Sequence, residues 1–357
     1  MRFRSDLAAF KPYTWEPSDR ELAEAYGLEE VHRFDKNTMP FTPKGWVEEL
    51  KSRLSSLDVN RYPDAYQEVR EMLSEYTGVD EDGIILVNGG DEGLDVIFKA
   101  LLDPGDEVIV SSPTYSLIGI STVLNRGEVR EVLRRPDFRD DADAILEAVR
   151  DGTKLIALCS PNNPTANTSD RRDVLRLLES GLAVLVDEAY YEFSGKTFSD
   201  LLKDYENLII LRTFSKAFCL AGARVGYLLA DPRVALELSK VKPPNSVSIF
   251  SLELAKIALE HVDEVRKYVE EVVKERDRCI KELTGIGGLK VYPSESNFIL
   301  LRFEGKSSKE VHDELLRRGL VVRDVGSMPM LEGCIRFSVG RPEEDDLLLD
   351  AIKELAS

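Results

Sequence analysis

The chain has 357 residues, of which 43% are hydrophobic and 31% are charged, a composition typical of ordinary globular proteins. It carries 65 Asp and Glu residues against 47 Lys and Arg residues, a net charge of −18. A surface this acidic argues against binding to nucleic acid or to anionic membranes, although a locally basic pocket could still hold a small anionic ligand.

The cysteine and histidine residues predict neither a disulfide framework nor a metal site. The four cysteines are widely spaced and form no CxxC pair, which is typical of reduced, buried thiols in a cytoplasmic protein. The histidines His32, His261 and His312 are scattered, so we expect no zinc site and no serine–histidine triad. No run approaches 18 apolar residues and the N-terminus lacks a signal-peptide core, so we expect a cytoplasmic protein with no membrane partner.

Short apolar runs alternate with helical patterns between residues 84 and 230. IILVN at 84–88 precedes the helical pattern EGLDVIFKALL, and EVIVS at 107–111 precedes a helix-like stretch that starts at Tyr115. Further apolar runs follow at 154–159, 183–189, 207–213 and 225–230. Runs this apolar predict strands buried on both faces, as in a mostly parallel α/β sheet flanked by helices.

The pattern changes after KPPNSVS at 242–248. A long helical pattern rich in Glu, Lys and Arg runs from about Ser251 to about Leu283, and strand-like and helical segments then alternate to the end of the chain. These features predict a smaller α+β domain. We therefore expect an N-terminal arm and return strand at 1–40, a large ligand-binding domain at 41–245 and a small domain at 246–357.

Polar residues follow several of the predicted strands, and ligands of open α/β sheets bind at the carboxyl ends of the strands. The first strand runs into GGDEG at 89–93, where glycines would let a phosphate approach a helix N-terminus, although such glycines also serve tight turns. The strand at 154–159 runs into SPNNPT at 160–165, which offers two asparagine amides or simply forms a rigid turn.

A carboxylate and an amine end two successive strands. Asp187 closes a fully apolar run and needs a partner if buried, unless it caps a helix, and Lys216 follows the next run, 216 − 187 = 29 residues later. A lysine, a carboxylate, a tyrosine hydroxyl, an asparagine amide and a phosphate cup are together the groups that pyridoxal phosphate requires. The residues therefore predict a pyridoxal-phosphate enzyme.

The chain also resembles a known family over nearly its whole length. It is similar to the fold-type I pyridoxal-phosphate aminotransferases of class I/II, and most similar to the histidinol-phosphate aminotransferases among them. The segments that carry the resemblance are RYP at 61–63, GGDEG at 89–93, SPNNPT at 160–165, VDEAYYEF at 186–193, LRTFSKAFCLAGARVGY at 211–227 and CIRFSVG at 334–340.

The resemblance implies a role for each residue around the cofactor ring. Lys216 would hold the cofactor as a Schiff base and then move the α-proton, while Asp187 would pair with the pyridine nitrogen. Tyr190 and Asn163 would donate hydrogen bonds to the ring hydroxyl oxygen, and Tyr115 would stack on the ring.

The same resemblance implies how the cofactor phosphate is held. Ser215, Arg224 and the backbone around Gly90, Asp91 and Glu92 would bind it within one chain. Tyr62 would reach it from the second subunit, so the resemblance implies a homodimer with shared active sites. The expected small-molecule partners are an amino donor and a 2-oxo acid acceptor, usually 2-oxoglutarate.

Substrate recognition is also implied only by the resemblance. Arg336 would grip the substrate carboxylate or its counterpart, and Arg323 would meet a substrate phosphate. Tyr13, from the N-terminal arm, would close over that phosphate, and both Asn37 and Asn297 fall at positions near the substrate. An exposed arginine and a packed arm tyrosine are the structural alternatives for Arg323 and Tyr13.

Two segments depart from the family pattern. Asn-Pro-Thr-Gly here ends in Ala166, which would be strained by about 1 kcal/mol if the position needs a positive φ. The family's Asn-Glu-Asn-Pro reads Asn-Thr-Met-Pro at 37–40, so the glutamate that borders the substrate side chain is absent and the imidazole-bearing substrate is less firmly indicated.

Several rival functions remain open from the sequence. The chain could be an aromatic or broad-range aminotransferase, or a threonine-phosphate decarboxylase with the same lysine segment. A nucleotide-binding oxidoreductase would need a GxGxxG pattern, which is absent. A transcription regulator built on this fold would need an added DNA-binding domain, for which we expect no room in this acidic chain.

Overall fold

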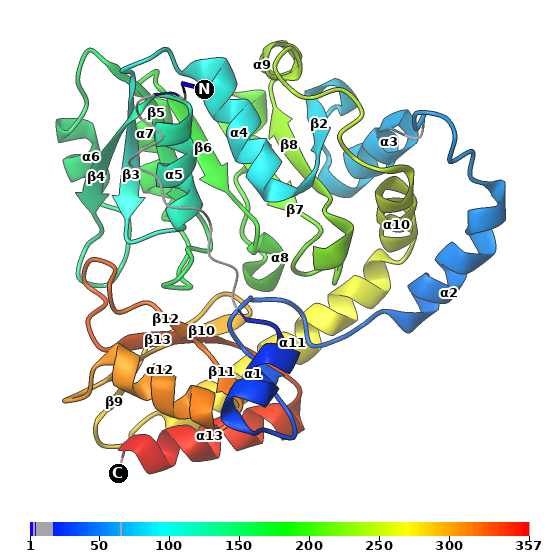
Figure 1. Cartoon of the computed structure of the whole chain (residues 1–357). Coiled ribbons are helices and arrows are strands. Elements are labelled where there is room, and N and C mark those ends of the chain that lie inside the picture. Colours follow the sequence, from blue (N-terminus) through cyan, green and yellow to red (C-terminus); the bar gives the residue numbers. More distant parts are fainter. Residues whose placement is uncertain (3, 5–16, 65, 357) are drawn as a thin grey trace.

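The computed structural model in Figure 1 describes residues 1–2, 4, 17–64 and 66–356. Within these residues the larger part of the molecule is built on a seven-stranded sheet in the order β2-β8-β7-β6-β5-β3-β4. β8 runs antiparallel to β2 and β7, and the other neighbours are parallel. The strands are β2 Ile84–Val87, β3 Glu107–Ser112, β4 Glu128–Leu133, β5 Thr153–Cys159, β6 Ala183–Asp187, β7 Leu208–Thr213 and β8 Gly226–Ala230.

Helices cover both faces of this sheet. Alternate residues of β2 show why its run is apolar throughout, since Ile84 and Leu86 pack into one core and Ile85 and Val87 into the other. One face carries α4 Gly89–Leu101, α5 Ser116–Leu124 and α9 Pro232–Ser239. The other carries α3 Tyr66–Thr77, α6 Ala142–Glu147, α7 Arg171–Leu178, α8 Tyr191–Ser194 and α10 Ile249–Glu260, with α2 Lys44–Arg53 beside α10. No helix among the described residues is both long and apolar enough to cross a membrane.

The α/β fold and the predicted apolar strands are confirmed, and one strand was missed. β4 lies at the edge of the sheet, and its residues are exposed or half-buried in turn. Its sequence EVREVL therefore lacks the apolar run by which the buried strands were found.

The smaller part contains a four-stranded antiparallel sheet in the order β12-β13-β10-β9. Its strands are β9 Leu289–Val291, β10 Phe298–Phe303, β12 Arg323–Asp324 and β13 Cys334–Ser338, and its helices are α1 Asp19–Tyr26, α11 Val262–Leu283, α12 Ser308–Arg317 and α13 Pro342–Ala356. β1 His32–Arg33 pairs in parallel with β11 Leu320–Val321, so the predicted return strand joins this part of the molecule.

The helix expected from about Ser251 to about Leu283 is in fact two helices. It breaks at His261, whose backbone leaves the helical region and whose imidazole Nε2 lies 2.9 Å from a carboxylate oxygen of Glu49. α10 packs on α2 and α3, whereas α11, yellow in Figure 1, runs on toward the small sheet. The division of the chain near residue 245 therefore stays a prediction.

Ala166, which stands where the family pattern has glycine, adopts the positive φ that the sequence analysis considered. Ala166 has a φ of 62° and is fully buried. Its amide donates to the carbonyl of Asn162 and its own carbonyl accepts from the amide of Glu295, both at 2.7 Å. These bonds hold the alanine in the left-handed region at a cost of about 1–2 kcal/mol.

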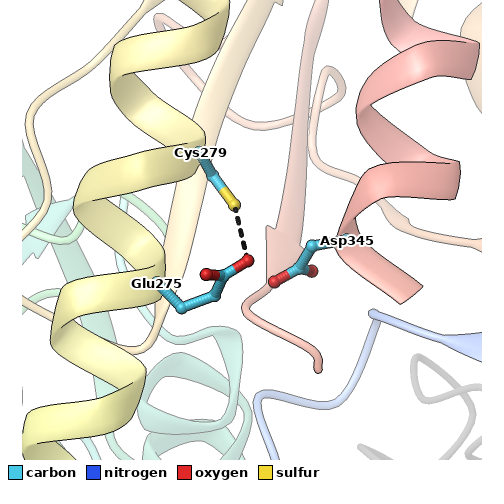
Figure 2. Close-up of side chains that lie close together, drawn as sticks. All are labelled: Glu275, Cys279 and Asp345. Atoms are coloured by element: carbon cyan, nitrogen blue, oxygen red, sulfur yellow. Dashed lines mark hydrogen bonds between the residues drawn. The ribbon is translucent and has the colours of Figure 1, made fainter. Parts of the chain in front are cut away.

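Three buried or half-buried side chains meet between α11 and α13 in the small part of the molecule (Figure 2). Ligand atoms of Glu275, Cys279 and Asp345 all lie within 4.8 Å of one another. Arg278 already donates to both oxygens of Glu275 at 3.0 Å, which supplies the positive charge that a metal ion would bring. Asp345 is 1% exposed, and burial, to which the nearby Glu275 adds, raises its pKa to about 7, so this carboxyl keeps its proton below neutral pH.

This pair predicts a pH-dependent stability. Because Asp345 has a folded-state pKa raised from 3.8 to about 7, its stabilising contribution is lost as the pH rises through that window. Asp345→Asn imitates the protonated acid and keeps an oxygen for the Gly340 amide, which donates to Oδ1 at 2.9 Å. We expect the free energy of unfolding of the variant, relative to that of the parent, to rise by about 1–3 kcal/mol between pH 5.5 and pH 8.5.

Urea unfolding at the two pH values measures this difference. Glu343→Gln is the matched control, because it removes an exposed carboxylate from the same helix turn and should act alike at both pH values. A stability difference between Asp345→Asn and the parent that does not grow from pH 5.5 to pH 8.5 would contradict the raised pKa of Asp345.

Candidate active site

The carboxyl ends of the central strands open into a cavity of about 840 Å³. The large sheet contributes the first turn of α4, the end of β6 at Asp187 and the segment after β7 that carries Lys216. The small sheet closes the opposite wall with Arg323 of β12 and Arg336 of β13. The cavity thus lies where the topology of an open α/β sheet places ligands.

Most of the predicted site residues line this one cavity. They are Lys216, Asp187, Tyr190, Asn163, Tyr115, Ser215, Arg224, Gly90, Asp91, Asn37, Arg323 and Arg336. The chain brings them together from positions as much as 336 − 37 = 299 residues apart. Their roles stay predictions.

The amine of Lys216 is held in a low-dielectric position. Its Nζ donates to the carbonyl oxygen of Lys36 at 3.0 Å and lies 5.4 Å from the centre of the Tyr190 ring. Burial, and next the positive charge of Arg336, lower the pKa of this amine to about 8. A neutral form is therefore accessible near physiological pH, as a nucleophile or a base requires.

Asp187 is the second group whose ionisation is shifted by burial. It is 4% exposed, and its Oδ1 accepts from the amide of Ala189 at 3.0 Å. Burial raises the pKa of this carboxyl to about 7. A positively charged partner in the cavity would be needed to hold it ionised.

The predicted ring contacts lie on two sides of the cavity. Tyr190 is buried, and its hydroxyl accepts a 3.0 Å hydrogen bond from Nδ2 of Asn37. Asn163 accepts on Oδ1 from Nη1 of Arg336 at 2.6 Å, which orients its amide. Burial raises the pKa of the hydroxyls of Tyr115 and Tyr190, so both stay protonated donors.

A set of donors gathers at the first turn of α4. Nη1 of Arg224 lies 3.4 Å from Oγ of Ser215, and Nη2 lies 3.3 Å from Oδ2 of Asp91. A Cβ on Gly89 would stand 2.5 Å from Nη2 of Arg224, so glycine is required for the guanidinium to reach this helix end. The hydroxyl, the guanidinium and the helix N-terminus together form a site for a phosphate.

Two arginines mark the opposite, small-sheet end of the cavity. Arg323 and Arg336 are register partners across β12 and β13. Arg336 also donates to the carbonyl of Asp35, and burial lowers its pKa to about 10. Nε of Arg336 is buried without a hydrogen-bond partner among the described residues, so this guanidinium can bind one more acceptor.

Some predicted residues do not line the cavity. Oε2 of Glu92 accepts instead from the amide of Asn88 and the hydroxyl of Ser246. Tyr62 is 83% exposed on the outside of the chain. Tyr13 lies outside the described residues. Asn297 lies behind the cavity wall, where its Nδ2 donates to the carbonyl of Asn37 at 3.1 Å.

Sequence reasoning missed the stretch that supports the lysine. Asp35 and Lys36 line the cavity, and Lys36 contacts Lys216 through its backbone carbonyl. A backbone contact leaves no mark in side-chain chemistry, so only the position of both residues beside Asn37 could have drawn attention to them.

The residues present fit pyridoxal phosphate. Asp187 has the shifted pKa of a carboxyl that lacks its cation, which the protonated ring nitrogen would supply. Lys216 offers an amine of lowered pKa for a Schiff base, and the cup of Ser215, Arg224 and the α4 N-terminus matches a phosphate.

Comparisons with known proteins agree with this chemistry. A family model described as aminotransferase class I and II matches residues 29–352. A histidinol-phosphate aminotransferase of Dehalococcoides mccartyi is 39% identical over 327 residues, which cover 91% of this chain and 90% of that protein. One of Thermoanaerobacter pseudethanolicus is 36% identical over 356 residues, covering 99% and 98% of the two chains.

A solved structure shows the same fold. The histidinol-phosphate aminotransferase of Sinorhizobium meliloti, in complex with pyridoxal-5'-phosphate, superposes with a TM-score of 0.88 at 26% identity and covers 99% of this chain and 97% of its own. The chain therefore belongs to the aminotransferase class I and II family and is a pyridoxal-phosphate-dependent transaminase.

Proposed function

We propose that this transaminase moves an amino group between histidinol phosphate and a 2-oxo acid, 2-oxoglutarate being the expected acceptor, in two half-reactions that share one site. The observation that carries the proposal is the pair Arg323 and Arg336, two cations side by side at the substrate end of the cavity. The names of the relatives at 36–39% identity support the same substrate.

The chain supplies the groups that hold the cofactor in place. Bound pyridoxal phosphate supplies an electron sink that stabilises negative charge on the carbon bearing the amino group. Asp187 keeps a proton on the ring nitrogen, and the hydroxyl of Tyr190 and the amide of Asn163 donate to the ring hydroxyl oxygen. Ser215, Arg224 and the amides at the start of α4 hold the phosphate.

Lys216 is the group that moves the proton. Its Nζ lies in the cavity with a pKa lowered to about 8, so the neutral amine could take a proton from the carbon bearing the amino group and deliver it to C4′ of the bound cofactor. The carbonyl oxygen of Lys36 accepts a hydrogen bond from Nζ at 3.0 Å and so orients the amine of Lys216.

The two arginines explain how one site could take two unlike substrates. Register partners on an antiparallel ladder project from the same face of the sheet, with Cβ atoms about 5 Å apart. A phosphate dianion can bind across both guanidinium groups, and a dicarboxylate can place one carboxylate on each. Histidinol phosphate and 2-oxoglutarate are such ligands.

The exposed position of Tyr62 supports a homodimer. Tyr62 lies outside its own cavity, and a tyrosine that is 83% exposed is a natural contact for a second subunit. We propose that it completes the phosphate site of the partner subunit. Sedimentation velocity should give about twice the 40.1 kDa of one chain, and a fully active monomer would contradict the shared site.

The role of Arg323 predicts a selective loss. Arg323→Ala should raise the concentration of histidinol phosphate needed for half-saturation by about 10- to 100-fold, because a charge-assisted contact of about 1.5–3 kcal/mol disappears. Histidinol, which lacks the phosphate, should change by less than about 3-fold. Stopped-flow measurement of the first half-reaction gives the half-saturation concentration for each amine. Because no acceptor is present, any effect of the substitution on binding of the oxo acid does not enter.

Arg317→Ala is the matched control for this experiment. Arg317 is an exposed arginine of α12 that pairs with Glu314 and does not line the cavity. Arg317→Ala should leave the half-saturation concentrations of histidinol phosphate and histidinol unchanged. An equal loss for histidinol and histidinol phosphate in Arg323→Ala would refute the phosphate role. Release of CO₂ from threonine phosphate would indicate a decarboxylase instead. Preference for an aromatic amino acid would indicate an aromatic aminotransferase.

A further inference from the structure

A buried ion pair lies directly behind the two strand ends of the active site. Glu188 follows Asp187 at the end of β6, and Arg212 lies on β7 four residues before Lys216. Successive strand residues point to opposite faces, so Glu188 and Arg212 turn away from the cavity while Asp187 and Leu211 line it. The amide of Glu188 donates to the carbonyl of Leu211 at 2.8 Å, which joins the strands at this point.

The pair is closed on all sides by hydrogen bonds. Nε of Arg212 donates to Oε2 of Glu188 at 2.9 Å, and the side chains are 2% and 0% exposed. Oε1 of Glu188 accepts from the amide of Phe198 at 2.7 Å, and Nη2 of Arg212 donates to Oγ1 of Thr197 at 2.6 Å. The two opposite charges therefore balance each other inside the pair.

Other polar groups surround the guanidinium. The ring of Tyr191 lies 3.7 Å from its central carbon, and the hydroxyl of Tyr191 contacts that of Tyr76 at 2.6 Å. Tyr227 and Glu192 face it from β8 and α8. Burial raises the pKa of Glu192 to about 8, so near neutral pH this acid is largely uncharged and Glu188 is the anion that Arg212 balances.

We propose that Arg212 and Glu188 are positioning residues of the transamination site, which tie the strand ends carrying Asp187 and Lys216 and cancel each other's field there. The inference rests on the proposed roles of Asp187 and Lys216 toward pyridoxal phosphate. Neither side chain lines the cavity, so the pair acts indirectly. It positions Asp187, and its charges change the electrostatic potential at the cofactor.

Electrostatics explains why the pair must stay balanced. Glu188 is the carboxylate next to Asp187 in the chain, and its charge adds to the burial that raises the pKa of Asp187. Without Arg212 the negative charge of Glu188 would be uncompensated and would raise the pKa of nearby groups. Without Glu188 the positive charge of Arg212 would be uncompensated and would lower the pKa of these groups.

A charge cycle tests the proposal on the cofactor-loaded protein without substrate. The readout is the pH midpoint of the visible absorption of bound pyridoxal phosphate, which follows protonation next to Lys216. Arg212→Gln should raise this midpoint by about 0.5–1 pH unit and Glu188→Gln should lower it by a similar amount. The double variant should return to within about 0.3 unit of the parent, since the two uncovered charges are both removed.

Two controls separate this role from a loss of folding. Arg134 pairs with Asp140 at 3.0 Å and is as deeply buried, but neither residue adjoins Asp187 or lies on the strand that leads to Lys216. Arg134→Gln should lower the unfolding temperature and leave the midpoint in place. Arg212→Lys keeps the charge, so it should also keep the midpoint.

Several results would overturn the proposal. These are shifts of the same sign in the two single variants, a double variant as displaced as either single one, or an equal shift in Arg134→Gln. If Arg212→Gln does not fold, an unchanged midpoint in Glu188→Gln alone overturns it. Because no substrate is added, the outcome does not depend on whether histidinol phosphate is the natural amine.

Discussion

The active site depends on two ionisable groups that burial keeps close to neutrality. Lys216 and Asp187 end neighbouring strands, yet Nζ of Lys216 bonds the carbonyl of Lys36 and Oδ1 of Asp187 accepts from the amide of Ala189. Burial lowers the pKa of the amine to about 8 and raises that of the carboxyl to about 7. The chain therefore holds an amine and an acid of shifted pKa in one cavity, and we propose that pyridoxal phosphate binds the amine covalently and takes the acid as its counter-ion.

The rest of the fold serves this arrangement. Strands buried on both faces need helices on both sides, and their carboxyl ends then meet in one cleft. Gly89 leaves the space through which Arg224 reaches the start of α4. The small sheet brings Arg323 and Arg336 to the same cavity, where we propose that they bind the anionic groups of the substrates.

Much of this was predictable from the residues. The buried strands are continuous apolar runs, and the polar residues that follow them had to meet because parallel strands end at one edge. The edge strand β4 escaped because charged residues interrupt its apolar pattern, and the break at His261 escaped because helical periodicity continues across it. Ala166 was flagged as a misfit, and it indeed adopts a positive φ.

Contacts through the backbone and between distant segments could not be predicted. The carbonyl of Lys36 at the lysine amine, and Asn37 at the hydroxyl of Tyr190, join residues more than 150 positions apart. Nor could side-chain types alone reveal the Glu188–Arg212 pair, since either residue would be ordinary on a surface. Only the register of β6 and β7 brings the pair behind the site.

The most direct test of the account is a titration of the cofactor-loaded protein with histidinol phosphate in the absence of any acceptor. The visible absorption of bound pyridoxal phosphate should disappear in a saturable way at low concentration, while phenylalanine and tyrosine act far more weakly. An unchanged spectrum with histidinol phosphate, together with conversion by another amine, would contradict the proposed substrate and leave the family and its cofactor in place.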